Sequence, residues 1–456
     1  MLIIISDLHL GDGTCGKSIS PGAFYLFADR LREAAYHTSW RADNVYRPIE
    51  SIDLVLMGDI LDPQHSALWL DTTPGAPDYI RPWSDPQNPR YAKKLAQVTH
   101  AILDHNAEGL SVLRQCAQGK TIHIPPADAR GRPDYASEEQ INLPVRIHYM
   151  VGNHDWHYRL PGAAFDAIRQ EIIETIGLFN NAPTPFPWEI EESEPLKDLF
   201  SRYQAYGRHG DVYDKFNFDR EKGRNAATIG DVFAMEMLNR YPLEVERKLS
   251  GDLPPAIVDS LRKLTNVRPA LATPLWISGQ IRQHSTSKSL ESELKKIWDN
   301  LGHELLALDV VREADKAFQF DAVDALELLL SISRRTSFKT INEVVTWVRQ
   351  KMWNGELSYT NFALKEPTLL NGSARYIAYG HTHHHEVIPL DSDGLPPTRS
   401  YELYMNSGTW HSYYTLTAKD PKAQKFVPYQ MLTYLIVYRG DQRGGRHFEA
   451  WSGAFA

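Results

Sequence analysis

The stretch Met1-Leu2-Ile3-Ile4-Ile5-Ser6-Asp7-Leu8-His9-Leu10 contains an apolar run, Leu2 to Ile5, that is followed closely by an aspartate and a histidine. A nearly continuous apolar run of this kind predicts a strand that is buried on both faces, as in an α/β sandwich. It is too short, and too quickly interrupted by charge, to be a signal peptide. We therefore expect a buried first strand with reactive side chains at its carboxyl end.

Three further apolar runs end in the same way: Ile52 to Met57, Val145 to Val151 and Tyr376 to Tyr379. Each is followed by a cluster of polar residues capable of chemistry. Open α/β sheets place their ligands beyond the carboxyl ends of the strands. The recurrence predicts an α/β fold in which distant parts of the chain build one site.

The segments between the second and third runs are predicted to be helix and loop. Apolar residues at helical spacing run from Ala92 to Gln118, with Gly109 arguing against a single unbroken helix. Asp71 to Arg90 and Pro125 to Pro144 are rich in Pro, Asp and Gly, which favours long loops.

Residues 225–371 are predicted to be mostly helical. We expect them to form a large insertion or cap on a core made of residues 1–224 and 372–456. The signals are a shared helical face of Leu290, Leu294, Ile297 and Leu301, a helical pattern over Asp321 to Ser333, and a capping box at Thr340 to Glu343 for a helix running to about Trp353. Strand character resumes over Tyr401 to Met405 and Gln430 to Tyr438.

The charge balance limits the classes of partner. The chain has 49 Lys and Arg against 57 Asp and Glu, a net charge of -8, so there is no diffuse basic surface for nucleic acid. A local basic groove is still compatible with this total. Two cysteines, Cys15 and Cys116, suggest neither a disulfide framework nor a thiolate metal site. With no apolar stretch of about 18 residues we expect no membrane span, and a cytoplasmic location is the default.

The first two polar clusters offer carboxylates and an imidazole. Asp7 and His9 are two residues apart, so both side chains can point to one side of an extended backbone. Together they could bind one cation. Asp59 follows Gly58, and its two carboxylate oxygens can bridge two metals. Asp62 is better suited to orienting an imidazole or a loop amide than to binding metal. Taken alone, each cluster has an ordinary turn as its alternative.

The third cluster is Gly152-Asn153-His154-Asp155. Asn153 offers a neutral carbonyl oxygen to a metal, whereas His154 can serve as a proton donor if it faces the leaving group. The alternative is again a tight turn, because Asn and Asp tolerate turns.

The fourth cluster, Gly380-His381-Thr382-His383, is the most informative. Its two alternating imidazoles suit two different metals, one each. His384 and His385 extend the run, and we interpret them as flanking residues that face the substrate or, more simply, the solvent.

The segment Arg208-His209-Gly210-Asp211 could supply one more imidazole. The competing candidates are His157, His284 and His303; the last lies in an amphipathic helical pattern that favours a structural role. Oxygen and imidazole ligands without thiolate suit Mn, Fe, Zn, Co or Ni, and the mixture does not by itself choose among them. We expect two divalent ions and favour manganese.

The motifs DxH, GDxxD, GNHD, an isolated His and GHxH, in this order, resemble those of the calcineurin-like metallophosphoesterase superfamily. They cover only short islands of this chain. Asn406-Ser407-Gly408-Thr409-Trp410 also resembles the segment that follows the last motif in this family.

The resemblance implies a four-layer α/β/β/α sandwich with two metals. It assigns Asp7, His9, Asp59 and His383 to one metal, and Asp59, Asn153, His209 and His381 to the other, with Asp59 as the bridge. A hydroxide shared by the metals would attack phosphorus, with His154 as general acid and Asp62 as the second catalytic residue. We therefore expect a hydrolase that acts as a phosphodiesterase or phosphomonoesterase, on a phosphoester that the sequence does not specify.

Two alternatives remain. The opening motif resembles both lipid A pathway pyrophosphatases and DNA-repair nucleases of the superfamily, but the former are shorter and carry Arg where His154 stands. A nuclease needs basic residues beside the metals, and only a modest group is available: Arg208, Arg220, Lys222 and Arg224. The other alternative is an interaction scaffold that kept the fold and lost the chemistry, against which the complete ligand set and His154 argue.

Overall fold

The computed structural model has a mixed α/β fold, as the apolar runs predict. It describes residues 1–180, 182–249, 253–268, 270–284, 287–314, 323, 327, 330, 358–393, 400–417 and 425–454. The helices expected from Asp321 to Ser333 and from Thr340 to Trp353 therefore lie outside the described residues, isolated positions excepted. Among the described helices, none is both long and apolar enough to cross a membrane.

A five-stranded sheet with the order β14-β13-β1-β2-β5 holds the first three apolar runs. The central strand β1 (Leu2–Ile5) is parallel to β2 (Ile52–Met57), which is parallel in turn to β5 (Val145–Met150). On the other side, β13 (Met431–Val437) and β14 (Phe448–Ala454) run antiparallel. All residues of β1 and β2 are buried, as expected for continuous apolar runs.

The two faces of β1 contact different hydrophobic cores. Ile3 and Ile5 pack in a core with the helices on one face of the sheet. Leu2 and Ile4 pack in a second core, which the sheet shares with another sheet. The helices on the first face are α1 (Pro21–Thr38), α2 (Pro89–His105), α3 (Ala107–Ala117) and α4 (Ala163–Ile176).

The expected helical region from Ala92 to Gln118 is two helices, and the break lies at Asn106 rather than Gly109. The Asn106 side-chain amide donates to the carbonyls of Ile102 and Gly11, so it ends α2 and ties it to the loop after β1. Gly109 lies inside α3, where a Cβ would come 2.6 Å from the ring of Phe24. The glycine therefore permits close helix packing instead of breaking the helix.

The second sheet has the order β6-β8-β10-β9. It contains β6 (Ala205–Gly207) and the fourth apolar run, β8 (Tyr376–Tyr379), which are parallel. The strand β10 (Ser400–Ser407) is parallel to β8, and β9 (His385–Asp393) is antiparallel to β10. Both expected late strands, in β10 and β13, are therefore confirmed. The helices α5 (Glu194–Arg202), α14 (Thr360–Ala363) and α15 (Pro367–Leu370) lie against the outer side of this sheet. Elsewhere in the molecule, the short elements are β3 (His123–Ile124), β4 (Ile141–Asn142) and α16 (Gln442–Gly445).

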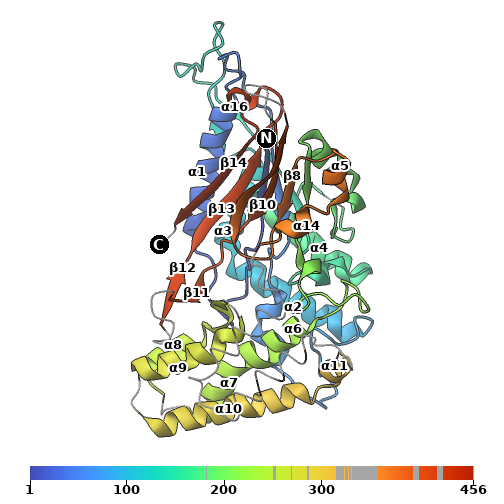
Figure 1. Cartoon of the computed structure of the whole chain (residues 1–456), viewed down its shortest axis with the longest axis vertical. Helices are drawn as coiled ribbons and strands as arrows, with labels where there is room; N and C mark the ends of the chain where they lie inside the picture. Colours follow the sequence, from blue (N-terminus) through green and yellow to red (C-terminus); the bar gives the residue numbers. More distant parts are fainter. Residues whose placement is uncertain are drawn as a thin grey trace.

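The helical segment lies below the sheets in Figure 1 and has its own hydrophobic core. It is not wholly helical, because β7 (Val267–Arg268) pairs in parallel with β11 (Tyr413–Leu416), which pairs with β12 (Phe426–Tyr429). The described helices are α6 (Ile229–Phe233), the π-helix η6 (Ala234–Asn239), α7 (Arg240–Leu249), α8 (Pro255–Leu261), α9 (Thr273–His284), α10 (Lys288–Leu306) and α11 (Asp309–Arg312).

The π-helix η6 docks this segment onto the sheet region. Glu236 forms a buried ion pair with Arg81, with 3.0 Å between Oε1 and Nε. Asn239 donates to the carbonyl of Gln64, at 2.7 Å, in the turn that follows β2. Polar contacts between buried groups are geometrically demanding, so they fix the helical segment in one position over the strand ends.

Candidate metal centre

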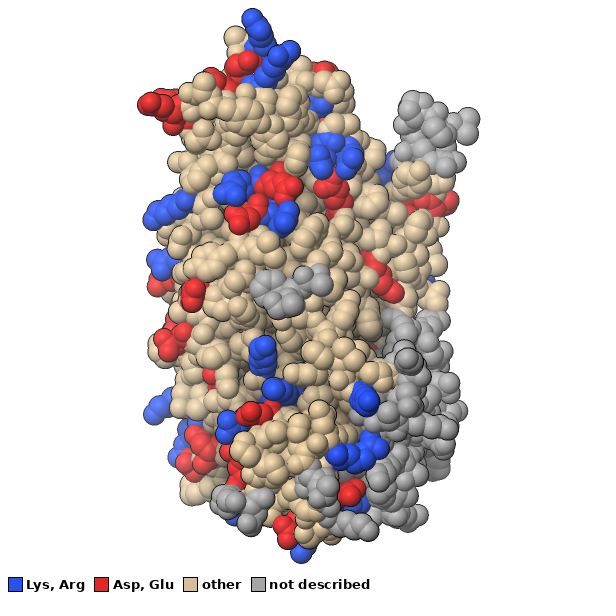
Figure 2. Space-filling model, turned by 90° about the vertical axis from the view of Figure 1, so that its left-hand side faces the viewer, with Lys and Arg blue, Asp and Glu red and all other residues tan. Residues whose placement is uncertain are grey.

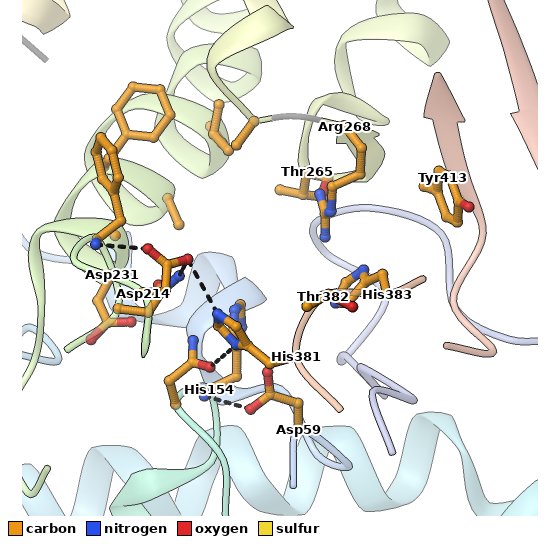
Figure 3. A pocket seen from close by; sticks show the side chains of 18 of the residues that line it. Asp59, His154, Asp214, Asp231, Thr265, Arg268, His381, Thr382, His383 and Tyr413 are labelled. Atoms are coloured by element: carbon orange, nitrogen blue, oxygen red, sulfur yellow. Dashed lines mark hydrogen bonds and ion pairs between the residues drawn. The ribbon is translucent and has the colours of Figure 1, made fainter. Parts of the chain in front are cut away.

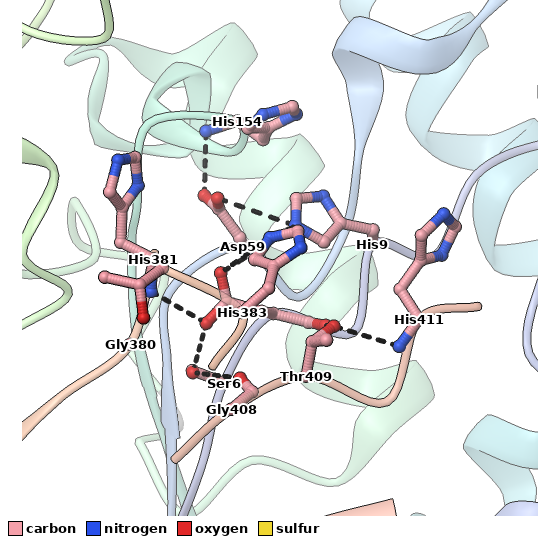
Figure 4. Close-up of polar contacts among 12 residues, drawn as sticks. Ser6, His9, Asp59, His154, Gly380, His381, His383, Gly408, Thr409 and His411 are labelled. Atoms are coloured by element: carbon pink, nitrogen blue, oxygen red, sulfur yellow. Dashed lines mark hydrogen bonds and ion pairs between the residues drawn. The ribbon is translucent and has the colours of Figure 1, made fainter. Parts of the chain in front are cut away.

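The structure brings all seven expected metal ligands together where strands of both sheets end. Asp7 and His9 follow β1, Asp59 follows β2, Asn153 follows β5, His209 follows β6, and His381 and His383 follow β8. Five of them are buried, and the two histidines of the fourth cluster are partly exposed. Figure 4 shows most of this cluster.

The first group of ligands consists of Asp7, His9 and His383. His9 Nε2 lies 3.0 Å from His383 Nε2, and His383 Nε2 lies 3.3 Å from Asp7 Oδ1. At metal–ligand distances of about 2.1 Å, two ligands at a right angle lie about 3 Å apart. The spacing of these atoms therefore fits donors to a single cation.

The second group consists of Asp59, His209 and His381, with Asn153 beside them. Asp59 Oδ2 lies 3.1 Å from His209 Nε2, and Asn153 Oδ1 lies 3.2 Å from the same nitrogen. The distance from Asn153 Oδ1 to His381 Nδ1 is 2.9 Å. Asp59 Oδ2 is also 3.8 Å from His9 Nε2 in the first group, so this carboxylate is placed between the two groups.

One buried oxygen supports the fit of a cation. Asp7 Oδ1 accepts no hydrogen bond among the described residues, although the ring nitrogens of His383 and His9 lie 3.3 and 3.8 Å away. The other oxygen, Oδ2, accepts from the Ser6 hydroxyl and from the backbone N–H of His381. A buried carboxylate oxygen without a donor is costly unless a cation satisfies it.

The backbone is left-handed at five of the seven ligands. Asp, Asn and His adopt positive φ more readily than other residues with a Cβ, yet each such residue costs about 1–3 kcal/mol. Among the described non-glycine residues, only three others share this conformation. The five ligands are Asp7 (φ 54°), His9 (48°), Asp59 (54°), His381 (66°) and His383 (62°).

Two glycines allow the ligands to approach the backbone. A Cβ on Gly152 would collide with Asp59 Oδ1, and it would lie 2.8 Å from His209 Nε2. A Cβ on Gly380 would lie 2.7 Å from Asp7 Oδ2. The glycines of the GNHD and GHxH motifs are therefore required by the close approach of chain to carboxylate.

Asp62 lies outside both groups and contacts three imidazoles. Its Oδ2 accepts from His9 Nδ1 at 2.8 Å and lies 2.7 Å from His65 Nδ1, and its Oδ1 lies 3.1 Å from His154 Nδ1. Holding a histidine by Nδ1 fixes the ring and leaves Nε2 available. Asp62 is thus an orienting residue. His65 ends the 3-10 turn Pro63–His65, and no motif in the sequence indicated that its side chain would lie beside Asp62.

His154 lies at the edge of the cluster. Its backbone N–H donates to Asp59 Oδ1 at 2.8 Å, and its side chain is 19% exposed. Burial lowers the pKa of His154, but the charges of Asp62 and Asp59 outweigh this and raise it above the usual value. The imidazole is therefore able to keep a proton while facing the pocket.

Opposite charges hold the cluster together. Burial disfavours the charged form of His9, but Asp62 and Asp7 raise its pKa to about 10. Asp59 and Asp7 likewise overcome burial at His209 and raise its pKa to about 10. In return, the pKa of Asp7 is held well below its usual range despite burial, chiefly by the charge of His209. Divalent cations placed here would replace these protons.

Asp214, also missed from the sequence, supports His381 from outside the cluster. Its Oδ2 lies 3.2 Å from His381 Nε2, while the Nδ1 of that ring faces Asn153. A carboxylate on the outer nitrogen of a ligating histidine sets the orientation of the ring. The residues around Asp214 form no sequence motif that would predict its contact with His381.

The competing histidines lie elsewhere. His157 is buried, with Nδ1 2.8 Å from the Tyr91 hydroxyl and Nε2 3.1 Å from Gln64 Nε2. His284 and His303 are exposed on helices of the helical segment. His384 is exposed and lines the pocket, whereas His385 begins β9.

The segment from Asn406 to Trp410 supports the cluster from below. Thr409 donates to the carbonyl of Asp7, and the Asn406 amide donates to the carbonyl of Gly380 at 2.8 Å. The hydroxyl groups of Ser6 and Ser407 form a hydrogen bond, with 2.6 Å between the two oxygens. These contacts connect the loops that carry the first and last motifs (Figure 4).

A pocket of about 340 Å³ opens over the cluster. Asp59, Asn153, His154, His381 and His383 lie on its floor side, and Figure 3 shows Asp214 and Asp231 on one side and Arg268 on another. The helical segment supplies the apolar wall with Phe233, Ala234 and Leu238. Its volume is that of a site for a small molecule.

In the comparisons with known proteins, no family model and no curated protein sequence matched this chain.

Proposed function

We propose that this chain is a metal-dependent phosphoester hydrolase of the calcineurin-like metallophosphoesterase type. The observation that carries the proposal is the position of Asp59, whose Oδ2 lies 3.1 Å from His209 Nε2 in its own group of ligands and 3.8 Å from His9 Nε2 in the other group. Two cations that share a carboxylate are suited to in-line displacement at phosphorus, because they stabilise both the attacking and the leaving oxygen.

We further propose the four-layer α/β/β/α arrangement, with residues 1–224 and 372–456 as its core and 225–371 as a cap. It is supported by the core that the two sheets share and by the helices on their outer faces. The strand β7 modifies the expected cap, since it joins a sheet with residues from the end of the chain.

In this proposal, separate residues of the chain bind the metals and donate the proton. When bound, two divalent cations lower the pKa of a water and neutralise phosphoryl oxygens. Asp7, His9, Asp59 and His383 would hold one cation, and Asp59, Asn153, His209 and His381 the other. Asp62 accepts the Nδ1 proton of His154, so that His154 Nε2 can give its proton to the leaving-group oxygen. The ligand set contains no thiolate and suits Mn, Fe, Zn, Co or Ni, with manganese proposed first.

The charge distribution favours a small phosphoester over a nuclease substrate. Arg208 pairs with Glu189 and Glu366, and Arg224 pairs with Asp211 and Glu189, so half of the expected basic group is neutralised internally. On the face drawn in Figure 2, basic and acidic side chains are interspersed. A continuous basic surface is what nucleic acid would need.

The test is hydrolysis of bis-p-nitrophenyl phosphate and p-nitrophenyl phosphate by manganese-loaded protein, with metal content measured by elemental analysis. We expect turnover of at least one ester, and loss of both turnover and bound metal in Asp59→Ala. Full metal occupancy without hydrolysis of either ester would favour the scaffold, and nicking of DNA in the same buffer would favour the nuclease.

A further inference from the structure

Arg268 is a cation in the wall of the pocket with no carboxylate partner among the described residues. It is partly buried in β7, at the end of the helical segment, and lines the same pocket as His154 and His383. Its Nη1 donates to the carbonyls of Thr265 and Val267 at 2.7 and 3.1 Å. These two contacts leave the remaining N–H groups of the guanidinium available to a ligand.

The position of Arg268 is fixed by two distant parts of the chain, residues 411–415 and the loop that contains Lys17. Arg268 pairs with Thr415 of β11 across the small sheet. Two residues earlier, the buried Asn266 donates to the Ser412 carbonyl at 2.7 Å and contacts His411 Nε2 at 2.7 Å. The side-chain amide oxygen of Asn266, Oδ1, accepts from the backbone N–H of Lys17 at 3.1 Å, in the loop that follows the first motif. The backbone that carries Arg268 is therefore held in place, and the two hydrogen bonds of Nη1 hold the guanidinium against it.

Among the described residues that line the pocket, the other charged side chains are all negative apart from the histidines. Asp59, Asp214 and Asp231 line it, and Figure 3 shows Arg268 across the cavity from the last two. With cations bound, the carboxylates of the cluster would be neutralised. Arg268 would then be a positively charged side chain in the pocket wall, apart from the cations. The planar guanidinium of an arginine in such a position can donate two parallel hydrogen bonds to two oxygens of a phosphoryl group.

We propose that Arg268 is the anion-binding residue of this pocket and donates hydrogen bonds to a phosphoryl oxygen of a small phosphoester. This inference rests on the proposed function. It assigns to the helical segment a direct part in substrate recognition: the segment adds a cation to a pocket whose seven expected metal ligands all follow strands of the two sheets. It also predicts that the substrate keeps at least one anionic oxygen that the metals do not bind.

The experiment compares Arg268→Met, Arg268→Lys and the control Arg262→Met in manganese-loaded protein. Arg262 lies in the same segment but is 57% exposed and pairs with Glu246 at 2.9 Å. Binding of inorganic phosphate is measured by equilibrium dialysis, and kcat and KM are measured with the better p-nitrophenyl ester. Metal content and melting temperature are recorded for each variant.

We expect Arg268→Met to weaken phosphate binding by about 10- to 100-fold and to lower kcat/KM by a similar factor, with two metals retained. Arg268→Lys keeps the charge but loses the forked geometry, so an intermediate loss of about 5-fold or more is expected. Arg262→Met should match the unsubstituted protein. If Arg268→Met has a lowered melting temperature, the phosphate binding and kinetics of Arg268→Lys decide whether the inference holds.

Unchanged phosphate binding and kinetics in folded Arg268 variants of an active protein would overturn this inference and leave the proposed function intact. If the unsubstituted protein neither binds phosphate nor hydrolyses an ester, the proposed function fails first, and this inference falls with it.

Discussion

Asp62 and His154 face each other with 3.1 Å between Oδ1 and Nδ1, while the other oxygen of the same carboxylate holds His9. A single buried side chain thus orients one expected metal ligand and the expected proton donor. Substitutions at Asp62 and His154 should consequently give different results.

Replacing His154 by Ala removes the proposed proton donor but none of the expected metal ligands. We expect turnover to fall by about 10²- to 10⁴-fold, the range for a positioned general acid, with both metals retained. Steady-state kinetics and elemental analysis of the same sample measure the two effects. Loss of metal from this variant would contradict the assigned role and place His154 among the ligands.

Replacing Asp62 by Asn should affect both functions. His9 loses the carboxylate that fixes its ring, and loss of such an outer partner weakens metal binding by about 10- to 100-fold. Turnover at saturating manganese should fall as well, because His154 loses its support. Asp71→Asn is the matched control, since Asp71 is 47% exposed and pairs with Lys94. A metal titration that is the same for both variants would refute the role given to Asp62.

The metal-free protein should lose stability as the pH rises. The pKa values of His9 and His209 are raised from 6.5 to about 10 in the folded protein, so the folded state binds more protons than the unfolded chain between these values. Their stabilising contribution is complete below about pH 6.5 and disappears as the pH approaches 10. We expect the melting temperature of chelated protein to fall from pH 7 to pH 9.5.

Manganese-loaded protein should show a smaller fall over the same interval, because ligating histidines are already neutral. Parallel melting curves with chelator and with manganese make the comparison. A chelated protein whose melting temperature rises with pH would show that the cluster is not held by these ion pairs.

The ion pair between Arg81 and Glu236 should matter for stability and little for metal binding. Both side chains are 3% exposed, and Arg81→Met leaves Glu236 buried with Arg240 as its remaining partner. Removing one member of a buried pair costs about 3–5 kcal/mol, which urea unfolding would measure. The double variant Arg81→Met/Glu236→Leu should be less destabilised than Arg81→Met. Equal stability of the single variant and the unsubstituted protein would mean that the helical segment docks without this pair.

The apolar runs predicted the strands well because burial on both faces leaves a continuous signal in the sequence. The ends of β1, β2 and β8 agree with the expected ranges, and β5 ends one residue earlier. The helix break was misplaced because a glycine weakens a helix only in the absence of packing, whereas Gly109 is packed against Phe24. Strand β7 was missed because two residues carry no periodicity and their partner is distant in the chain.

The site was predictable to the extent that its residues stand in motifs at strand ends. All seven ligands lie together in the structure, although the sequence left His209 and His157 in competition. His65, Asp214 and Arg268 were not foreseen, because only tertiary contacts place them beside the cluster. Their identity depends on how the second sheet and the helical segment are positioned, which local sequence does not encode.

The left-handed backbone at five of the expected ligands limits how the candidate metal centre can be redesigned for another ion. Exchanging Asp7 or Asp59 for a β-branched residue would strain the main chain as well as remove a carboxylate. Asn, Asp and His tolerate the required torsion best. An engineer who wishes to change the selectivity of the centre should therefore interchange these three side chains before trying any other.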